Sequence, residues 1–106
     1  MSGRGEVVFS GTWGHEESVN DPDTVRVFRS DDQPPFGLRL DICKHRTTDG
    51  WQIEAFMAAD PLDGVPVTPE GLRRMARQAR HLDAWLEQAA RHIEHARRDL
   101  SETDGA

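Results

Sequence analysis

Apolar and polar side chains alternate in two consecutive segments, residues 37–45 and 51–57. A period of two is typical of strands that bury one face, and Asp49-Gly50 between the segments favours a tight hairpin turn. The pattern therefore predicts two paired antiparallel strands. The positions expected to form the core under a helix are Leu38, Leu40, Ile42, Trp51, Ile53 and Met57.

Two more strands are predicted nearer the start of the chain. Residues 6–13 are rich in β-branched and aromatic side chains, and residues 24–29 share this composition. The charged segment 15–23 between them ends in turn-forming residues, so we expect an exposed loop there. Beyond the hairpin, the sequence predicts a turn at residues 60–64 and a short extended edge at residues 65–67.

Alternation in the second of these strands assigns Val27 to one face and Phe28 to the other. Phe28 is then expected to join Cys43 and Phe56 in a small apolar cluster. This cluster would lie on the side of the sheet away from the core.

A different period begins at residue 69. Thr68 predicts a helix N-cap, Pro69 suits the first helical position, and Glu70 lies where the helix dipole favours an acid. Apolar residues then recur at alternating spacings of three and four, which is a heptad seam and predicts one unbroken helix over residues 68–100. The seam positions are Leu72, Met75, Ala79, Leu82, Leu86, Ala89, Ile93, Ala96 and Leu100.

The expected helix is too long for its own sheet. At 1.5 Å per residue it would span about 48 Å, whereas strands of this length cover roughly 17–27 Å. A second copy of the same helix is the simplest surface that could bury the remainder. We therefore expect a homodimer through the seam, with parallel or antiparallel pairing left open. The alternative is a break near Arg91 that folds the helix back.

These elements predict an α+β fold, with an antiparallel sheet of about four strands followed by one long C-terminal helix. The sheet region covers residues 1–67, the helix residues 68–100 and a flexible tail residues 101–106. All three belong to one domain, because 106 residues are too few for two.

Charge and composition narrow the expected function. A net charge of −6 disfavours a general nucleic-acid coat or a binder of anionic membranes. A single cysteine, Cys43, cannot form an internal disulfide. The first residues lack the apolar run of a signal peptide, and no stretch is long and apolar enough to span a bilayer. We therefore expect a cytoplasmic protein.

Basic residues crowd the start of the predicted helix. They are Arg73, Arg74, Arg77 and Arg80, with no acid between Gly71 and Leu82. A stripe of guanidinium groups suits carboxylates and phosphates, so these residues are candidates for docking an acidic protein partner, with Arg39 and Lys44 extending the same patch. The alternative is that the stripe balances the acidic side chains of its own chain or of a dimer mate.

Three other features of the sequence could carry a function. His92, His95 and Asp99 recur at helical spacing and could contribute to a metal site, although solvated side chains are the commoner outcome. Trp85, beside the seam, is expected to be a packing anchor.

The third feature is a set of three residues on one face of a strand, Asp41, Cys43 and His45. Residues two apart on a strand stand about 6.5–7 Å from each other, too far for a thiolate and an imidazole in contact. We expect no catalytic residue, no metal and no cofactor.

The order of four strands and a long helix resembles the positive-cofactor-four type of single-stranded DNA-binding coactivator. The resemblance covers about residues 36–88 and rests on Leu38, Leu40, Ile42, Val67-Thr68-Pro69-Glu70 and the seam to Leu86. It implies a curved antiparallel sheet and a helix that makes the dimer.

Residues 65–90 also look like short accessory proteins of unknown function from high-GC Gram-positive bacteria and their mobile elements. In both, an Arg/Ala/Leu-rich helix follows the Thr-Pro-Glu start. The expected function is a non-enzymatic interaction or regulatory module. A single-stranded nucleic-acid binder is the first alternative, and a small enzyme or metal protein is the second.

Overall fold

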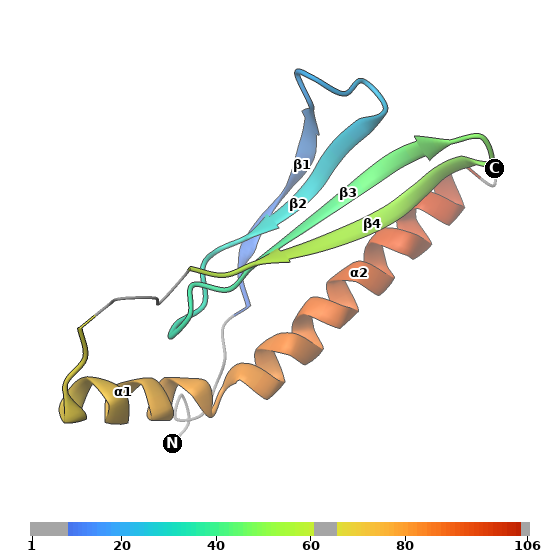
Figure 1. Cartoon of the computed structure of the whole chain (residues 1–106). Coiled ribbons are helices and arrows are strands. Elements are labelled where there is room, and N and C mark those ends of the chain that lie inside the picture. Colours follow the sequence, from blue (N-terminus) through green and yellow to red (C-terminus); the bar gives the residue numbers. More distant parts are fainter. Residues whose placement is uncertain (1–8, 61–65, 105–106) are drawn as a thin grey trace.

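The computed structural model describes residues 9–60 and 66–104 of the chain. Four strands precede two helices, and the second helix lies across one face of the sheet (Figure 1). The elements are β1 (Gly11–Glu17), β2 (Thr24–Ser30), β3 (Arg39–Thr47), β4 (Gly50–Ala58), α1 (Pro69–Ala79) and α2 (Leu82–Asp104). This confirms the α+β class with a four-stranded antiparallel sheet and a C-terminal helix.

The sheet is a simple meander in the order β1-β2-β3-β4, with every neighbouring pair antiparallel. β3 and β4 pair without interruption from Arg39 opposite Ala58 to Thr47 opposite Gly50, which confirms the predicted hairpin. Gly50 adopts a φ of 107°, a left-handed conformation that favours glycine. β4 forms one edge of the sheet and β1 the other.

The core lies between α2 and the face of the sheet that carries Leu40 and Ile42. These two side chains are 2% and 0% exposed, as the alternation predicted. The buried residues of the core cluster are Phe28, Leu40, Ile42, Trp85, Ala89 and Ala96. Trp85 is 1% exposed, which confirms it as a packing anchor.

The other predicted core positions of the hairpin are less covered. Leu38 and Ile53 are half-buried and pack against the cluster. Trp51 is also half-buried, with Lys44 and Arg46 over its ring. Met57 remains 48% exposed, because α2 does not cover this end of β4.

Phe28 lies on the opposite face of β2 from the one predicted. Arg26 pairs with Cys43 and Phe28 pairs with Ile42, so Val27 is an extra residue in a β-bulge. A bulge ends strict alternation along a strand. Both Val27 and Phe28 therefore belong to the core cluster, and the cluster predicted for Phe28 with Cys43 and Phe56 does not form.

The single helix predicted over residues 68–100 is broken at Arg80 and His81, which lie in a turn between α1 and α2. The predicted alternative near Arg91 is not the site, because α2 continues through it. α2 also extends to Asp104, beyond the expected start of a tail at residue 101. Neither described helix is long and apolar enough to cross a membrane.

The first strand begins later than predicted. β1 spans Gly11–Glu17 and is exposed throughout, so residues 15–17 of the expected loop are in fact strand. Pairing with β2 holds them there despite their charge, since Glu16 lies opposite Arg26. Residues 6–8 and the predicted turn and edge at residues 61–65 lie outside the described residues, while Pro66 and Val67 are not in a strand.

Candidate functional site

α1 stands outside the core of the domain. It has no buried residue. α2 packs against β3 and β4, whereas α1 makes no comparable contact with a described strand. Figure 1 shows it extending past the end of the sheet. Its start is well defined, because the Thr68 hydroxyl accepts a hydrogen bond of 3.0 Å from the Gly71 N–H and Pro69 follows the cap, as predicted.

The predicted basic stripe lies along one side of α1 and ends at Arg80, the C-cap of this helix, which keeps a helical backbone conformation. At about 100° per residue, the first, third and fourth of its arginines fall within about 60° of one another and the second flanks them. All four are exposed, and none forms an ion pair within residues 9–60 and 66–104. We call this surface the arginine row; its members are Arg73, Arg74, Arg77 and Arg80.

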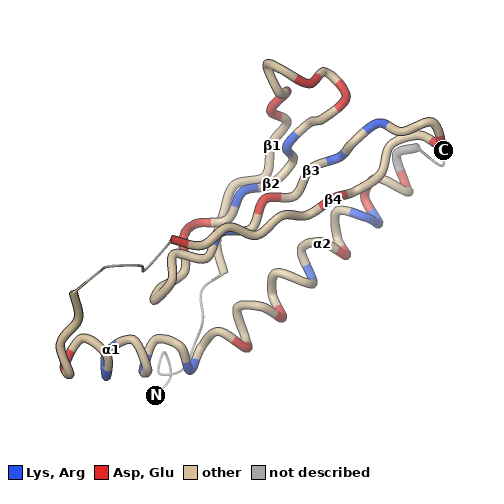
Figure 2. The backbone as a smooth tube through the Cα atoms, in the orientation of Figure 1, with Lys and Arg blue, Asp and Glu red and all other residues tan. Residues whose placement is uncertain are grey.

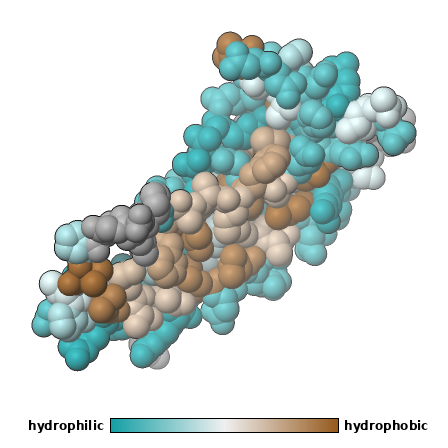
Figure 3. All heavy atoms as spheres, in the orientation of Figure 1, coloured by the Kyte–Doolittle hydropathy of each residue, from teal (hydrophilic) through white to brown (hydrophobic). Residues whose placement is uncertain are grey.

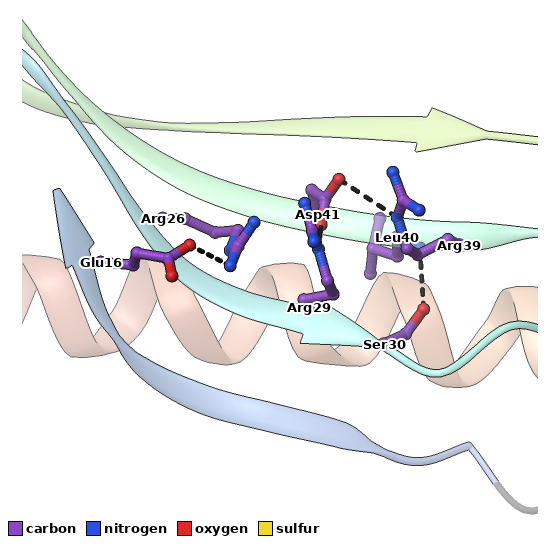
Figure 4. Close-up of polar contacts among 7 residues, drawn as sticks. All are labelled: Glu16, Arg26, Arg29, Ser30, Arg39, Leu40 and Asp41. Atoms are coloured by element: carbon purple, nitrogen blue, oxygen red, sulfur yellow. Dashed lines mark hydrogen bonds and ion pairs between the residues drawn. The ribbon is translucent and has the colours of Figure 1, made fainter. Parts of the chain in front are cut away.

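Two arginines of the sheet, unlike those of the arginine row, are paired with acidic side chains. Arg26 forms an ion pair with Glu16, and the Arg29 Nε donates a hydrogen bond of 2.8 Å to Asp41 (Figure 4). This contact with Asp41 raises the pKa of the Arg29 guanidinium. The positive charge of these two strand residues is therefore compensated within the chain, whereas that of the arginine row is not compensated by any described residue.

Arg39 and Lys44 do not extend the arginine row. They are five positions apart on β3, so their side chains leave opposite faces of the strand. The Arg39 Nε lies 3.6 Å from the Asp41 carboxylate on the outer face, away from α2, and the Lys44 Nζ lies 5.1 Å from the centre of the Trp51 ring. Each is thus engaged in its own local contact.

The side of α1 opposite the arginine row is apolar. Leu72 of α1 is 50% exposed, and Leu86 of α2 and Met57 of β4 are 46% and 48% exposed. Figure 3 shows apolar side chains running from α1 along α2 and β4. We call this surface the apolar band; it comprises Leu72, Met75 and Ala79 of α1, Leu86 of α2 and Met57 of β4.

The predicted dimer seam is divided between two environments. Ala89 and Ala96 are buried against the chain's own sheet, so these two are not available to a second copy. Ile93, Leu82 and Leu100 are half-buried. The sheet covers the flank of α2 centred on Trp85, and it leaves the flank that carries Leu86 open.

Asp41, Cys43 and His45 share the outer face of the sheet, as predicted, but they do not contact one another as a reactive group would require. The Asp41 carboxylate accepts from Arg29. The His45 Nδ1 lies 2.8 Å from the Thr24 hydroxyl. Burial, followed by the charge of Asp41, raises the pKa of the Cys43 thiol, which disfavours the nucleophilic thiolate.

Two shallow depressions, each of about 360 Å³, lie on this outer face. Both are lined by Glu16, Arg26 and Arg29. Both arginines are already paired with acids of the same sheet, so neither offers an uncompensated positive charge to a small ligand.

His92 belongs to an aromatic cluster. Its ring is 4.5 Å from the Phe9 ring and stacks on Trp13 at 5.7 Å, and its Nδ1 lies 2.9 Å from the Gln88 carbonyl oxygen. The His95 ring meets the same Trp13 edge-on. No group of three metal-binding side chains is found among the described residues.

Comparison of the chain with family models, with curated proteins and with solved structures gives no match.

Sequence patterns had not identified Met57 as part of an exposed surface. Its position on the core face of β4 predicted burial, and only the course of α2 leaves it open. One feature of the sequence could have indicated this exposure: β4 is the last strand of the meander. An edge strand has fewer neighbours to cover it.

Proposed function

We propose that this protein is a non-enzymatic interaction module that binds an acidic segment of another protein through the arginine row of α1. One observation carries the proposal: the row is exposed and unpaired with described residues on a helix that contributes nothing buried to the core. No acidic side chain of the described residues therefore balances the row. Guanidinium groups form paired hydrogen bonds with carboxylates.

The charge of the rest of the molecule favours a short acidic segment over a long polyanion. The chain carries a net charge of −6. The connection between β1 and β2 holds Asp21 and Asp23, next to Glu16 and Glu17 at the end of β1, and Figure 2 shows this connection far from α1. A long nucleic-acid strand would meet such repulsive surfaces, while a short acidic segment needs to touch only the row.

A single-stranded nucleic acid is the second candidate, and one feature of the hairpin favours it. Trp51 has the Lys44 Nζ at 5.1 Å and the Arg46 guanidinium carbon at 4.7 Å from its ring centre. Aromatic rings beside cations are used to stack bases and to hold phosphates. This surface lies on the sheet and is distinct from the arginine row.

The test measures binding of a fluorescent oligoglutamate peptide at low ionic strength. Arg73→Gln with Arg77→Gln removes two charges from the row, and Arg97→Gln with Arg98→Gln removes two exposed charges from α2. Since each exposed ion pair contributes up to about 1 kcal/mol, the first variant should weaken binding about tenfold. The matched second variant should retain wild-type affinity within about twofold.

Three results would contradict the proposal. The first is an equal loss in both variants, which would show that only net charge matters. The second is the absence of any binding by the wild type. The third is tighter binding of an oligodeoxythymidine strand that is lost in Trp51→Ala, which would favour the nucleic-acid candidate.

A further inference from the structure

The apolar band leaves large hydrophobic side chains exposed on a single copy of the chain. We infer that two copies associate so that α1 of each lies against the open flank of α2 and the uncovered end of β4 of the other. This goes beyond the proposed function, because it uses the opposite side of α1 from the arginine row.

The first support is that both halves of such a contact are exposed in one chain. Leu72 on α1 is 50% exposed, while Leu86 and Met57 are 46% and 48% exposed. A two-fold axis that places α1 of one copy on the partner's α2 and β4 places the partner's α1 on the first copy as well. One symmetry operation therefore covers every part of the band.

The second support is the amount of surface that the chain leaves exposed. A compact monomer of 12.0 kDa is expected to expose about 6,000 Å², but this chain exposes 7514 Å². Its radius of gyration is 16.8 Å, against about 13 Å expected for a compact domain of this length. The excess is roughly 1,500 Å² for each copy, or about 3,000 Å² for two copies. Obligate homodimers bury roughly 2,000–5,000 Å² for both partners together, so the excess falls within that range.

The third support is the character of β4. It is an edge strand of nine residues, Gly50–Ala58, and it contains neither lysine nor proline. Proteins commonly protect exposed edges with such residues, because an open edge pairs readily with other chains. The one charged side chain of β4 is Glu54, so a second copy over the end of β4 would cover part of an edge strand that the chain itself leaves open.

Association through the apolar band leaves the arginine row available. On α1, Leu72, Met75 and Ala79 are centred about 155° away from the arginines, at about 100° per residue. The row of each copy therefore points away from the shared interface. Loss of self-association and loss of acidic-peptide binding can thus be measured separately.

The test is sedimentation equilibrium at micromolar concentrations. The wild type should be a dimer, and Leu72→Gln with Leu86→Gln should weaken association at least about a hundredfold, since four leucine side chains lose apolar burial in each dimer. Circular dichroism should show the same helix and strand content at the same protein concentration, because both leucines are half exposed in the single chain.

A matched pair of neighbours on β4 supplies the control. Met57→Gln should weaken the dimer, whereas Phe56→Gln should not, because Phe56 is equally exposed at 55% but lies on the outer face. A monomeric wild type would overturn the inference, even if a variant fails to fold. A dimer that survives the double leucine substitution, or one lost in Phe56→Gln alone, would also overturn it. Dissociated variants should still bind oligoglutamate if the proposed function holds.

Discussion

Phe28 lies directly opposite Ile42 across β2 and β3, although Arg26 lies opposite Cys43. Arg26 and Phe28 are two positions apart on β2, but their partners are adjacent on β3, so Val27 is the extra residue. The bulge turns the Phe28 ring into the core, where it is 2% exposed and contacts the rings of Trp13 and His92. The interface between α2 and the first half of the sheet depends on this local irregularity.

Replacing Phe28 with alanine should lower the free energy of unfolding by about 3–5 kcal/mol, because a buried ring is lost and a cavity remains. Urea denaturation measures the change. Phe56→Ala removes the same side chain from the outer face, where it is 55% exposed, and should cost less than about 1 kcal/mol. Similar losses in the two variants would mean that the face of Phe28 is wrongly assigned.

Gly11 is required for the close approach of β1 to β2. A Cβ atom placed there would overlap the Arg29 carbonyl oxygen and lie 2.6 Å from the Phe28 ring. Gly11→Val should therefore destabilise the fold by about 1–3 kcal/mol, measured by thermal unfolding. Gly14→Val is the control, since a Cβ at Gly14 meets no atom within 4 Å; an equal drop there would show that crowding at Gly11 is not the cause.

Cys43 should react slowly with iodoacetamide near pH 8. Burial and the charge of Asp41 raise the pKa of its thiol, so less thiolate is present than in the urea-unfolded protein. Asp41→Asn removes one cause and should speed the reaction, while Asp49→Asn in the exposed turn should not.

The same shift of the Cys43 pKa has a consequence for stability. The folded chain retains the thiol proton at pH values where the unfolded chain has lost it. The free energy of unfolding should therefore decrease as the pH rises above about 8.5. A stability that rises with pH in this range in the wild type, but not in Cys43→Ala, would contradict the sign.

The Thr68 cap should control the helicity of α1 alone. Thr68→Ala removes the acceptor of the Gly71 N–H and should destabilise this helix by about 1 kcal/mol. Because α1 has no buried residue, the loss should appear as reduced far-ultraviolet ellipticity at low protein concentration, with little change in the unfolding midpoint. Thr68→Asn should preserve the signal. A large change of the midpoint in Thr68→Ala would show that α1 belongs to the core.

Several elements followed from short-range patterns in the sequence. The alternation in residues 37–57 predicted the β3–β4 hairpin and its buried Leu40 and Ile42, because successive strand residues face opposite sides whatever surrounds them. Thr68 and Pro69 predicted the start of α1, since capping needs only the neighbouring backbone. The exposed arginine stripe was likewise visible from helical spacing.

The break between α1 and α2 had no comparable signal. Neither Arg80 nor His81 is a helix breaker, and the heptad spacing of apolar residues continues across them. The one local hint is Asp83, an acid in the first turn of α2, where the helix dipole favours it. The direction of α2 is instead determined by Trp85, which is buried in the core, whereas α1, which carries Leu72, extends past the end of the sheet.

By itself, the sequence therefore determined which residues alternate, where the hairpin turns and where the first helix begins, because each depends on bonds and dihedral preferences within a few residues. Tertiary structure alone decided the bulge at Val27, the break at Arg80 and the flank of α2 that is buried. Those features depend on the packing of α2 against strands that lie tens of residues away in the chain, and such contacts leave no fixed period in the sequence.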